Sequence, residues 1–349
     1  MFSPDNPGER DHVFSRHAGL RRHDGLTVVA GRLLAVLCIA LLQACATPHP
    51  PEVFSPALPP TAELTDTPFF AQDDYQCGPA ALAMVLQADA VEVTPQQLQP
   101  LVYLPDNKGS LQVEMLAAAS HYGRLAVRIP PDVDSLLQEV AAGRPVLVLQ
   151  NLGHRLLPVW HYAVVVGYDL EAREIYLRSG RDARKVYPMQ RFLDSWAGAQ
   201  HWALVVVAPG KVPVSVSAAA YLRAASALER RQAVAAAWRA YHAGTRRWPE
   251  YALLWAAAGN AAYTLQRFAD ATAAYRRALS LQPGNVSVMN NLALALAARG
   301  CRQQAQSVLE CALAQAPEDA NLLLTRREIN ALKATAGVCE DFACTPAGH

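Results

Sequence analysis

Two residues, Cys77 and His161, have the types and the sequence settings that nucleophilic catalysis requires. Cys77 is followed by Gly78, Pro79 and the run AALAMVLQ, which predicts that the cysteine starts a helix. The unpaired N–H groups and the dipole at a helix N-terminus favour the thiolate, the reactive form of a cysteine. His161 opens the apolar run HYAVVVGYD, which predicts a strand. We therefore expect Cys77 to be a nucleophile and His161 to be the general base that takes its proton.

Taken alone, each of the two residues also has a structural interpretation. A cysteine in a core acts as a small hydrophobic side chain, and a histidine that opens an apolar strand is more often structural. Because His161 follows a helix-start cysteine by 84 residues, the two together favour catalysis. Neighbouring polar residues are given structural or surface roles: His121 with Tyr122 at a helix end, His154 in a loop beside the cleft, His201 with Trp202 in the core, and Asp73 with Asp74 as solvated charge.

Short helices and strands that alternate over residues 63–210 are expected to position this pair. Helices are predicted after Cys77, after the capping pair Thr94-Pro95 and over residues 110–122. Strands are predicted over residues 124–129, 145–150, 161–168, 174–177 and 202–207, with residues 169–173 as the turn of a hairpin. Helices that come first, followed by a mainly antiparallel sheet, predict an α+β domain.

These segments together resemble the papain-like cysteine peptidases that trim double-glycine leaders from bacteriocin precursors. The resemblance covers about residues 66–207 and includes the pattern GS-x-x-x-x-L at 109–116 and Trp196. It implies that Cys77 is the nucleophile, that His161 takes its proton and later protonates the leaving amine, and that Gln72 donates to the oxyanion. Gln72 lies five residues before the cysteine, one closer than in the family, and Gln76 competes with it for the same role.

The chain departs from the family at the residue that orients the histidine. The family places an Asp, in an Asp-Pro pair, at the end of the strand that follows the histidine strand; here that strand reads IYLRSG and Ser179 occupies the place. A serine accepts a hydrogen bond from imidazole but cannot stabilise imidazolium by charge. Asp169 in the hairpin turn and Asn151 at the end of a neighbouring strand are the alternatives. The departure predicts a slower enzyme, a two-residue Cys-His enzyme, or a non-catalytic peptide binder.

Residues 214–332 have a different pattern, almost purely helical, with a repeat of 34 residues. Pro249, Pro283 and Pro317 mark the period, and small residues recur twelve positions before each of them. This pattern resembles the tetratricopeptide repeat, in about three copies, and Gly259 fits the small position of the middle copy. Such arrays bind peptides or proteins in a groove, so we expect a protein ligand for this all-α domain. A plain helical bundle is the alternative.

The first 44 residues are interpreted as a lipoprotein signal peptide. Several arginines precede the apolar run LLAVLCIALL at 33–42, which is too short to span a bilayer. The run ends in LQAC, which resembles a lipobox and makes Cys45 the lipidated residue. Residues 45–62, which are rich in proline, are expected to form a tether. This predicts a lipid-anchored protein of the cell envelope, at the outer membrane and facing the periplasm; an ordinary cleaved signal is the alternative.

Charge and cysteine usage limit the partners. The sequence after Cys45 carries 26 basic and 26 acidic residues, so we expect no nucleic-acid partner. No cysteine or histidine cluster has the spacing of a zinc site, so no metal or other cofactor is expected. Cys301 and Cys311 lie too far apart along one helix to bridge each other. Cys339 and Cys344, in the polar tail at 333–349, could pair in an oxidising compartment.

The sequence therefore predicts a membrane-anchored cysteine peptidase whose helical repeats bind a protein or peptide. Two alternatives belong to other classes. One is an inactive peptidase fold that acts as a peptide-binding scaffold in the cell envelope. The other is a different thiol chemistry on the same fold, such as acyl transfer or hydrolysis of an amide that is not a peptide.

Overall fold

A computed structural model describes residues 54–72, 76–105, 109–332 and 339. The described residues all belong to one unit, which begins at Phe54. The predicted signal peptide, the predicted lipidation site Cys45 and the first half of the predicted tether lie outside the described residues. The last two tether positions, residues 61 and 62, belong to a short strand, β1 (Thr61–Glu63), which pairs with the main sheet.

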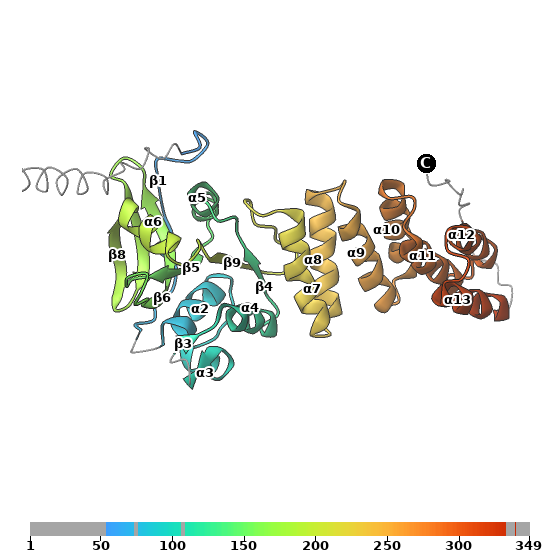
Figure 1. The fold of residues 1–349 in the computed structure, drawn as a ribbon, viewed down its shortest axis with the longest axis horizontal. Coiled ribbons are helices and arrows are strands. Elements are labelled where there is room, and N and C mark those ends of the chain that lie inside the picture. Colours follow the sequence, from blue (N-terminus) through green and yellow to red (C-terminus); the bar gives the residue numbers. More distant parts are fainter. Residues whose placement is uncertain (1–53, 73–75, 106–108, 333–338, 340–349) are drawn as a thin grey trace, which may run out of the picture. The chain divides into compact units, whose positions relative to one another are not determined.

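The first domain is an α+β domain built around one antiparallel sheet (Figure 1). The strand order is β4-β9-β5-β6-β7-β8, and β1 pairs with β6. The strands are β4 (Leu125–Arg128), β5 (Val146–Asn151), β6 (Trp160–Asp169), β7 (Glu174–Ser179), β8 (Asp182–Pro188) and β9 (Ala203–Val207). The helices are α2 (Cys77–Ala88), α3 (Pro95–Val102), α4 (Gln112–His121), α5 (Val133–Ala141) and α6 (Met189–Ala197), and β2 (Tyr103–Leu104) pairs with β3 (Gly109–Ser110) in a second, small sheet.

Each face of the main sheet carries its own core, because side chains alternate between the two faces of a strand. On β6, Val164 and Val166 pack with the helices α2, α3 and α4, whereas Ala163 and Val165 face α5 and α6. Figure 1 shows the two groups of helices on opposite sides of the sheet. The cysteine helix α2 thus lies on one face, directly over the strand that carries His161.

The predicted fold class is confirmed, with additions that the sequence did not indicate. The helix predicted from residue 110 begins at Gln112, because Gly109 and Ser110 form β3. The helices α5 and α6 and the edge strand β8 were not predicted. The hairpin between β6 and β7 was predicted correctly: Asp169 pairs with Glu174, and Oδ1 of Asp169 accepts a 2.8 Å hydrogen bond from the N–H of Ala172 within the turn.

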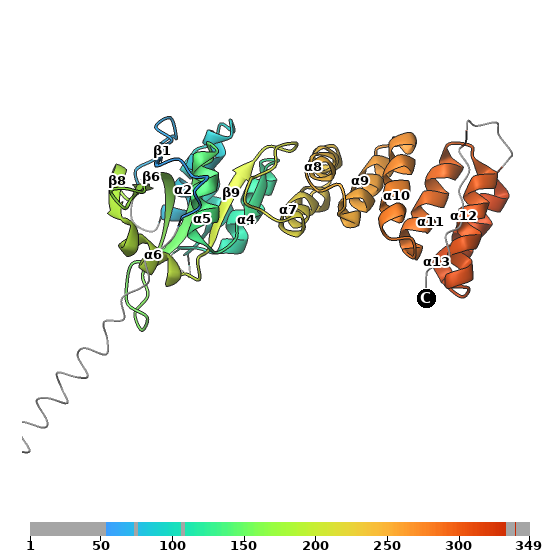
Figure 2. The same ribbon diagram turned by 90° about the horizontal axis from the view of Figure 1, so that it is seen from above.

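Seven helices follow, and their spacing reproduces the 34-residue period. They are α7 (Ala218–Arg230), α8 (Val234–Arg247), α9 (Ala252–Thr264), α10 (Phe268–Leu281), α11 (Val286–Ala298), α12 (Arg302–Gln315) and α13 (Ala320–Ala331). Consecutive helices lie side by side (Figure 2). A Cβ atom on Gly259 would approach Cε1 of Tyr275 to 2.5 Å, so the glycine allows α9 and α10 to pack closely. The structure is a tetratricopeptide-type array of three helix pairs and a terminal helix.

The first repeat helix shares a core with the sheet. Tyr221 on α7 is fully buried in the same apolar cluster as Leu125 and Val127 of β4. Its hydroxyl donates a 3.0 Å hydrogen bond to the carbonyl of Lys211 in the connecting segment. The buried carboxylate of Glu139 accepts hydrogen bonds from the N–H and the hydroxyl of Ser215, at 2.7 and 2.6 Å. The connection between sheet and repeats is therefore a packed joint.

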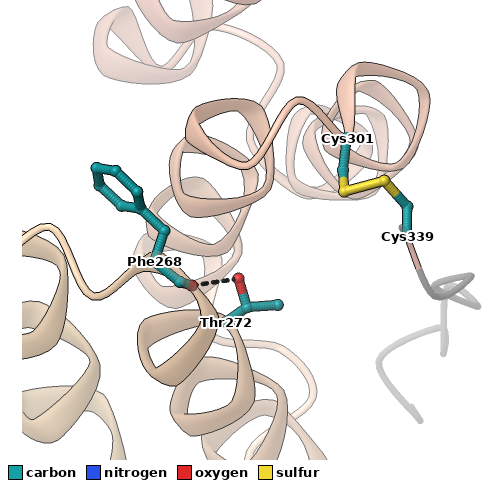
Figure 3. The surroundings of a disulfide bond; sticks show 4 residues. All are labelled: Phe268, Thr272, Cys301 and Cys339. Atoms are coloured by element: carbon teal, nitrogen blue, oxygen red, sulfur yellow. Dashed lines mark hydrogen bonds between the residues drawn. A yellow bond between two sulfur atoms is a disulfide. The ribbon is translucent and has the colours of Figure 1, made fainter. Parts of the chain in front are cut away.

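The cysteine pairing differs from the prediction. Cys339 forms a disulfide with Cys301, the N-cap residue of α12, and their Cα atoms are 5.6 Å apart (Figure 3). Cys311 is also disulfide-bonded. The predicted Cys339–Cys344 pair is wrong, because spacing within the tail does not indicate that Cys339 lies beside a helix 38 residues earlier. Within the described ranges, no helix has both the length and the apolar character needed to cross a bilayer.

Candidate active site

Cys77 is the first residue of α2 and lines a cleft of about 1020 Å³. The residue before it, Gln76, is the N-cap position but makes no side-chain cap hydrogen bond. The N–H groups of the first helical turn are therefore not satisfied by a side-chain cap. Cys77 is half-buried, and it is the free cysteine among the described residues. The prediction that the cysteine starts a helix is confirmed.

His161 reaches the same cleft from the second residue of β6. Its Nε2 atom lies 2.9 Å from Oγ of Ser179, the last residue of β7. The strands β6 and β7 are neighbours, so the sheet itself brings the serine to the ring. Ser179 is buried, so water has little access to this contact. Because Nε2 is engaged with Ser179, Nδ1 is the ring nitrogen that can exchange a proton with another side chain or with a substrate.

Gln72 lies in the extended segment before α2 and is held by the loop after β7. Its side-chain Oε1 accepts a 3.0 Å hydrogen bond from the backbone N–H of Gly180. The backbone N–H of Gln72 in turn donates to the carbonyl of Gly180 at 2.9 Å. Its Nε2 lies 3.5 Å from the carbonyl of Tyr162, at the long limit of a hydrogen bond. The buried amide therefore has a fixed orientation and a weakly engaged donor in the cleft. Of the two competing glutamines, Gln72 lines the cleft, whereas Gln76 is not among its lining residues.

The electrostatics of the pair favour neutral forms. Burial raises the pKa of the Cys77 thiol, and the N–H groups of Tyr162, Gly78 and Cys77 oppose this only in part. Burial, together with the nearby Lys185, lowers the pKa of His161 to about 4. The expected effect of the helix N-terminus is present, but desolvation is larger. At neutral pH the site therefore holds a thiol and a neutral imidazole instead of an ion pair.

Ser110 is a cleft residue that sequence reasoning did not single out beyond the GS pattern. Its Oγ is buried and has no hydrogen-bond partner among the described residues. A Cβ atom added to Gly78 would lie only 2.2 Å from this oxygen. Tyr162, which follows His161, donates from its hydroxyl to the carbonyl of Ser110 at 3.2 Å. Burial raises the pKa of the Tyr162 hydroxyl, so it stays protonated as a donor. The strand β3 is thereby fixed over the start of α2.

The alternative orienting residues, Asn151 and Asp169, make their hydrogen bonds elsewhere in the described part of the chain. Oδ1 of Asn151 accepts hydrogen bonds from the N–H groups of Gly153 and Val159, both at 3.0 Å, and so shapes the loop before β6. Asp169 is occupied in the hairpin turn at the other end of β6. Of the three candidates, Ser179 is the one whose hydrogen bond to the ring is found among the described residues.

The remaining polar candidates lie away from the chemistry. His154 is exposed in the loop before β6 but is not among the cleft-lining residues, contrary to expectation. His121 contacts the Arg231 guanidinium at 2.7 Å, and His201 packs edge-on against Trp196. Trp202 is buried, as expected. Asp73 and Asp74 lie outside the described residues. The described part of the chain contains no group of three or more His, Cys, Asp or Glu side chains that could hold a metal ion.

Several solved structures are similar to parts of the chain. A C39-like peptidase from Bacillus anthracis is 19% identical and covers 44% of this chain and 99% of its own, with a TM-score of 0.37. A double glycine motif protease from an AMS/PCAT transporter, in complex with the leader peptide, is 22% identical and covers 41% and 93%, with a TM-score of 0.32. The first TPR of Spaghetti (RPAP3), bound to an HSP90 peptide, is 18% identical and covers 32% and 90%, also with a TM-score of 0.32.

No curated protein sequence matches the chain. A family model does match, over residues 64–203, and it is described as the Peptidase_C39 like family. The matched segment contains the cleft with Cys77 and His161 and the strands β4 to β8 of the main sheet. Residues 64–203 are therefore similar to the Peptidase_C39 like family.

Proposed function

We propose that this chain is a cysteine peptidase that cleaves peptide bonds with Cys77 and His161 and is held at a membrane through Cys45. The observation that carries the proposal is the convergence of Cys77, His161 and Gln72 on one cleft, with Ser179 on the far nitrogen of the imidazole. The match to the Peptidase_C39 like family supports the reaction class.

The neutral state of the pair determines how the reaction would begin. As Sγ of Cys77 attacks the carbonyl carbon, His161 takes the thiol proton as a general base. The carbonyl becomes an oxyanion, which Nε2 of Gln72 would stabilise as a donor. The imidazolium then gives its proton to the leaving amine, the C–N bond breaks, and a thioester remains on Cys77. Water, deprotonated by His161, attacks the thioester, releases the acid and restores the thiol.

Ser179 would hold the imidazole ring in position and fix its tautomer. If Nε2 carries a proton and donates it to Oγ of Ser179, Nδ1 is an acceptor for the thiol proton. A serine does this without charge, so it stabilises the imidazolium less than an aspartate would. We therefore propose a functional but slow catalytic site.

The repeat domain would bind a protein or peptide, either the substrate or a partner that presents it. The disulfide between Cys301 and Cys339, and the bonded state of Cys311, support an oxidising compartment. The Cys45 anchor and the position at the outer membrane, facing the periplasm, belong to the same proposal and rest on the sequence of residues 1–60.

A second candidate function is a peptide-binding scaffold without catalysis. The observation that favours it is the neutral pair: no carboxylate of the described residues hydrogen-bonds to His161, and burial opposes formation of the thiolate. Another thiol chemistry, such as acyl transfer, would use the same groups and differ only in the acceptor of the acyl group.

The deciding experiment uses the full chain in detergent with a pool of peptides from a proteolytic digest. New peptide termini are identified by mass spectrometry in the parent, in Cys77→Ala and in His161→Ala, and the acyl group is trapped on Cys77 by an acid quench. Peptidase activity requires termini that appear with the parent and with neither variant. A trapped acyl group that passes to an amine would indicate acyl transfer, and peptide binding without new termini would indicate a scaffold.

A further inference from the structure

Residues 152–160, which are the loop between β5 and β6 and the first residue of β6, expose an unusual amount of apolar surface. Leu156 and Leu157 at its tip are 75% and 78% exposed, and Leu152, Val159 and Trp160 are each about half exposed. We call residues 152–160 the lip loop. Contiguous exposed apolar surface on a folded domain commonly marks a binding site.

The lip loop has a defined, hydrogen-bonded shape. The N–H of Leu152 donates to the carbonyl of Val159 at 2.8 Å, and His154 and Leu157 exchange backbone hydrogen bonds in both directions, at 3.1 and 2.9 Å. Gly153 packs so closely that an added Cβ would lie 2.3 Å from the carbonyl of Leu157. Asn151 holds both ends of the loop through its Oδ1 atom. The apolar side chains are therefore presented by a preformed hairpin.

The lip loop is continuous with the catalytic cleft. Pro158, Val159 and Trp160 line the cleft, and Trp160 directly precedes His161. Leu111 and Leu149 add further apolar surface to the lining. Among the described residues, no Asp, Glu, Lys or Arg lines the cleft. A charged side chain bound here would lose its hydration without gaining an opposite charge, which is unfavourable.

Two occupants fit an apolar loop, a lipid surface and a peptide segment, and the geometry favours the peptide. The other end of β6 pairs with β1, where Asp169 lies opposite Thr61. The chain before β1 therefore attaches at the end of β6 far from Trp160, about 30 Å away for a strand of this length. The lip loop, by contrast, adjoins His161 directly through Trp160, where a bound peptide substrate would lie. The tip also carries a single arginine, Arg155, which gives little attraction to an anionic bilayer.

We propose that the lip loop and the adjoining cleft bind an uncharged, apolar segment of the substrate next to the bond that is cleaved. This inference rests on the proposed peptidase function and adds the substrate class. Leu, Val or Phe side chains of the peptide pack on Trp160 and Val159, and the lip loop tip extends the contact away from the bond. Peptides with Asp, Glu, Lys or Arg at these positions are excluded by desolvation.

The test compares two loop variants with a matched surface variant. Val159→Ser with Leu157→Ser removes two apolar side chains from the lip loop, and Trp160→Ala removes the indole. Val186→Ser is the control, because Val186 is 42% exposed on β8 and does not line the cleft. The probes are three pools of synthetic twelve-residue peptides with Leu and Phe, with Ser and Gly, or with Lys and Asp at the variable positions. We expect both loop variants to lower kcat/KM for the apolar pool about tenfold, a loss of ~1.4 kcal/mol, and the control to leave it unchanged.

Binding separates the failure of this inference from the failure of the proposed function. In the Cys77→Ala background, fluorescence anisotropy measures the Kd of each labelled pool. If no pool is cleaved but the apolar pool binds and the loop variants weaken that binding, the substrate class stands and catalysis fails. If pools are cleaved equally well and bind equally well, catalysis stands and the inference is overturned.

A third measurement tests the lipid alternative with the full chain anchored in vesicles of phosphatidylethanolamine and phosphatidylglycerol. A polarity-sensitive dye is attached at Leu156→Cys in the Cys77→Ala background. We expect emission typical of water that shifts to the blue when the apolar pool is added. Blue-shifted emission before any peptide is added would place the lip loop in the bilayer and overturn the proposal.

Discussion

Nε2 of His161 lies 2.9 Å from Oγ of Ser179, and the two residues come from adjacent strands of one sheet. A neutral hydroxyl therefore stands where a carboxylate would balance the charge of an imidazolium. Burial, together with the nearby Lys185, keeps the pKa of His161 at about 4. The contact fixes the ring but gives little help to the charged state through which the reaction must pass.

Replacing Ser179 separates the positioning of the ring from its charge balance. Ser179→Ala removes one hydrogen bond, worth ~1 kcal/mol, so we expect kcat/KM to fall about fivefold. Ser179→Asp places a carboxylate beside the ring, which raises the pKa of His161 and shifts the acid limb of the rate profile to higher pH. Ser120→Ala, at another buried serine far from the cleft, is the control. An acid limb that stays in place in Ser179→Asp would show that the serine does not face the ring in solution.

The rate profile is expected to have a broad plateau. Catalysis by the neutral pair needs an unprotonated His161, whose pKa is about 4, and a protonated Cys77, whose pKa lies above its ordinary value. The value of kcat/KM should therefore rise near pH 4 and stay constant into the alkaline range, as measured with one peptide from pH 3 to 10. An alkaline limb near pH 8 would instead report a thiolate–imidazolium pair.

The same histidine links folding stability to pH without any need for a substrate. Its pKa is about 4 in the folded chain and 6.5 as a free side chain, so below pH 6.5 the unfolded chain binds a proton that the folded chain excludes. The contribution of His161 to the free energy of unfolding should be fully present above pH 6.5. It should fall by up to ~3 kcal/mol as the pH drops toward 4. Urea unfolding of the parent and of His161→Gln, compared between pH 7 and 4, isolates the contribution. Parallel curves for the two chains would contradict it.

Gly78 is required by the close approach of β3. A Cβ atom on residue 78 would lie 2.2 Å from Oγ and 2.6 Å from Cβ of Ser110, so rotating the serine alone cannot relieve the overlap. We expect Gly78→Ala to lower the free energy of unfolding by ~1–3 kcal/mol, the usual cost of overpacking, and to slow catalysis by displacing β3.

The double variant Gly78→Ala/Ser110→Gly tests the cause. It removes both overlapping atoms, so the stability measured by urea unfolding should recover toward that of the parent. If the single variant is as stable as the parent, the contact between β3 and α2 is looser than described. If the double variant does not recover, Ser110 is not what Gly78 accommodates.

Local patterns predicted much of this molecule. The 34-residue period placed the repeats because each helix pair repeats the same neighbour contacts, with Ala237, Ala271 and Ala305 all fully buried. The helix start at Cys77 was predictable because the residues that determine it, Gly78 and Pro79, directly follow Cys77 in the chain. The place of Ser179 followed from the order of two consecutive strands.

The rest depends on contacts between distant segments, which spacing does not encode. Ser110 reaches Gly78 through a two-residue strand that is too short to show a period. The neutral state of Cys77 and His161 depends on burial, which the helix N-terminus alone does not indicate. The lip loop has few polar residues, and only the structure shows that its leucines are exposed and not part of the core.

The joint between the sheet and the repeats is expected to depend on Glu139. Its side chain is fully buried; one oxygen accepts two hydrogen bonds from Ser215, and the other pairs with Arg144. Glu139→Ala leaves Arg144 and the N–H of Ser215 without their acceptor. Because the Arg144 side chain keeps 22% exposure, we expect a loss of ~3 kcal/mol, at the low end for a broken buried pair. Limited proteolysis should then begin within residues 208–217.

Glu250→Ala is the matched control, because Glu250 pairs with Arg277 at the surface, where an ion pair contributes at most ~1 kcal/mol. Urea unfolding and the proteolysis pattern of the two variants give the comparison. If Glu139→Ala behaves like Glu250→Ala, the joint is held by the apolar contacts of Tyr221 and its neighbours alone. If it unfolds earlier and is cut in the connecting segment, the buried carboxylate of Glu139 holds the first repeat helix to the sheet.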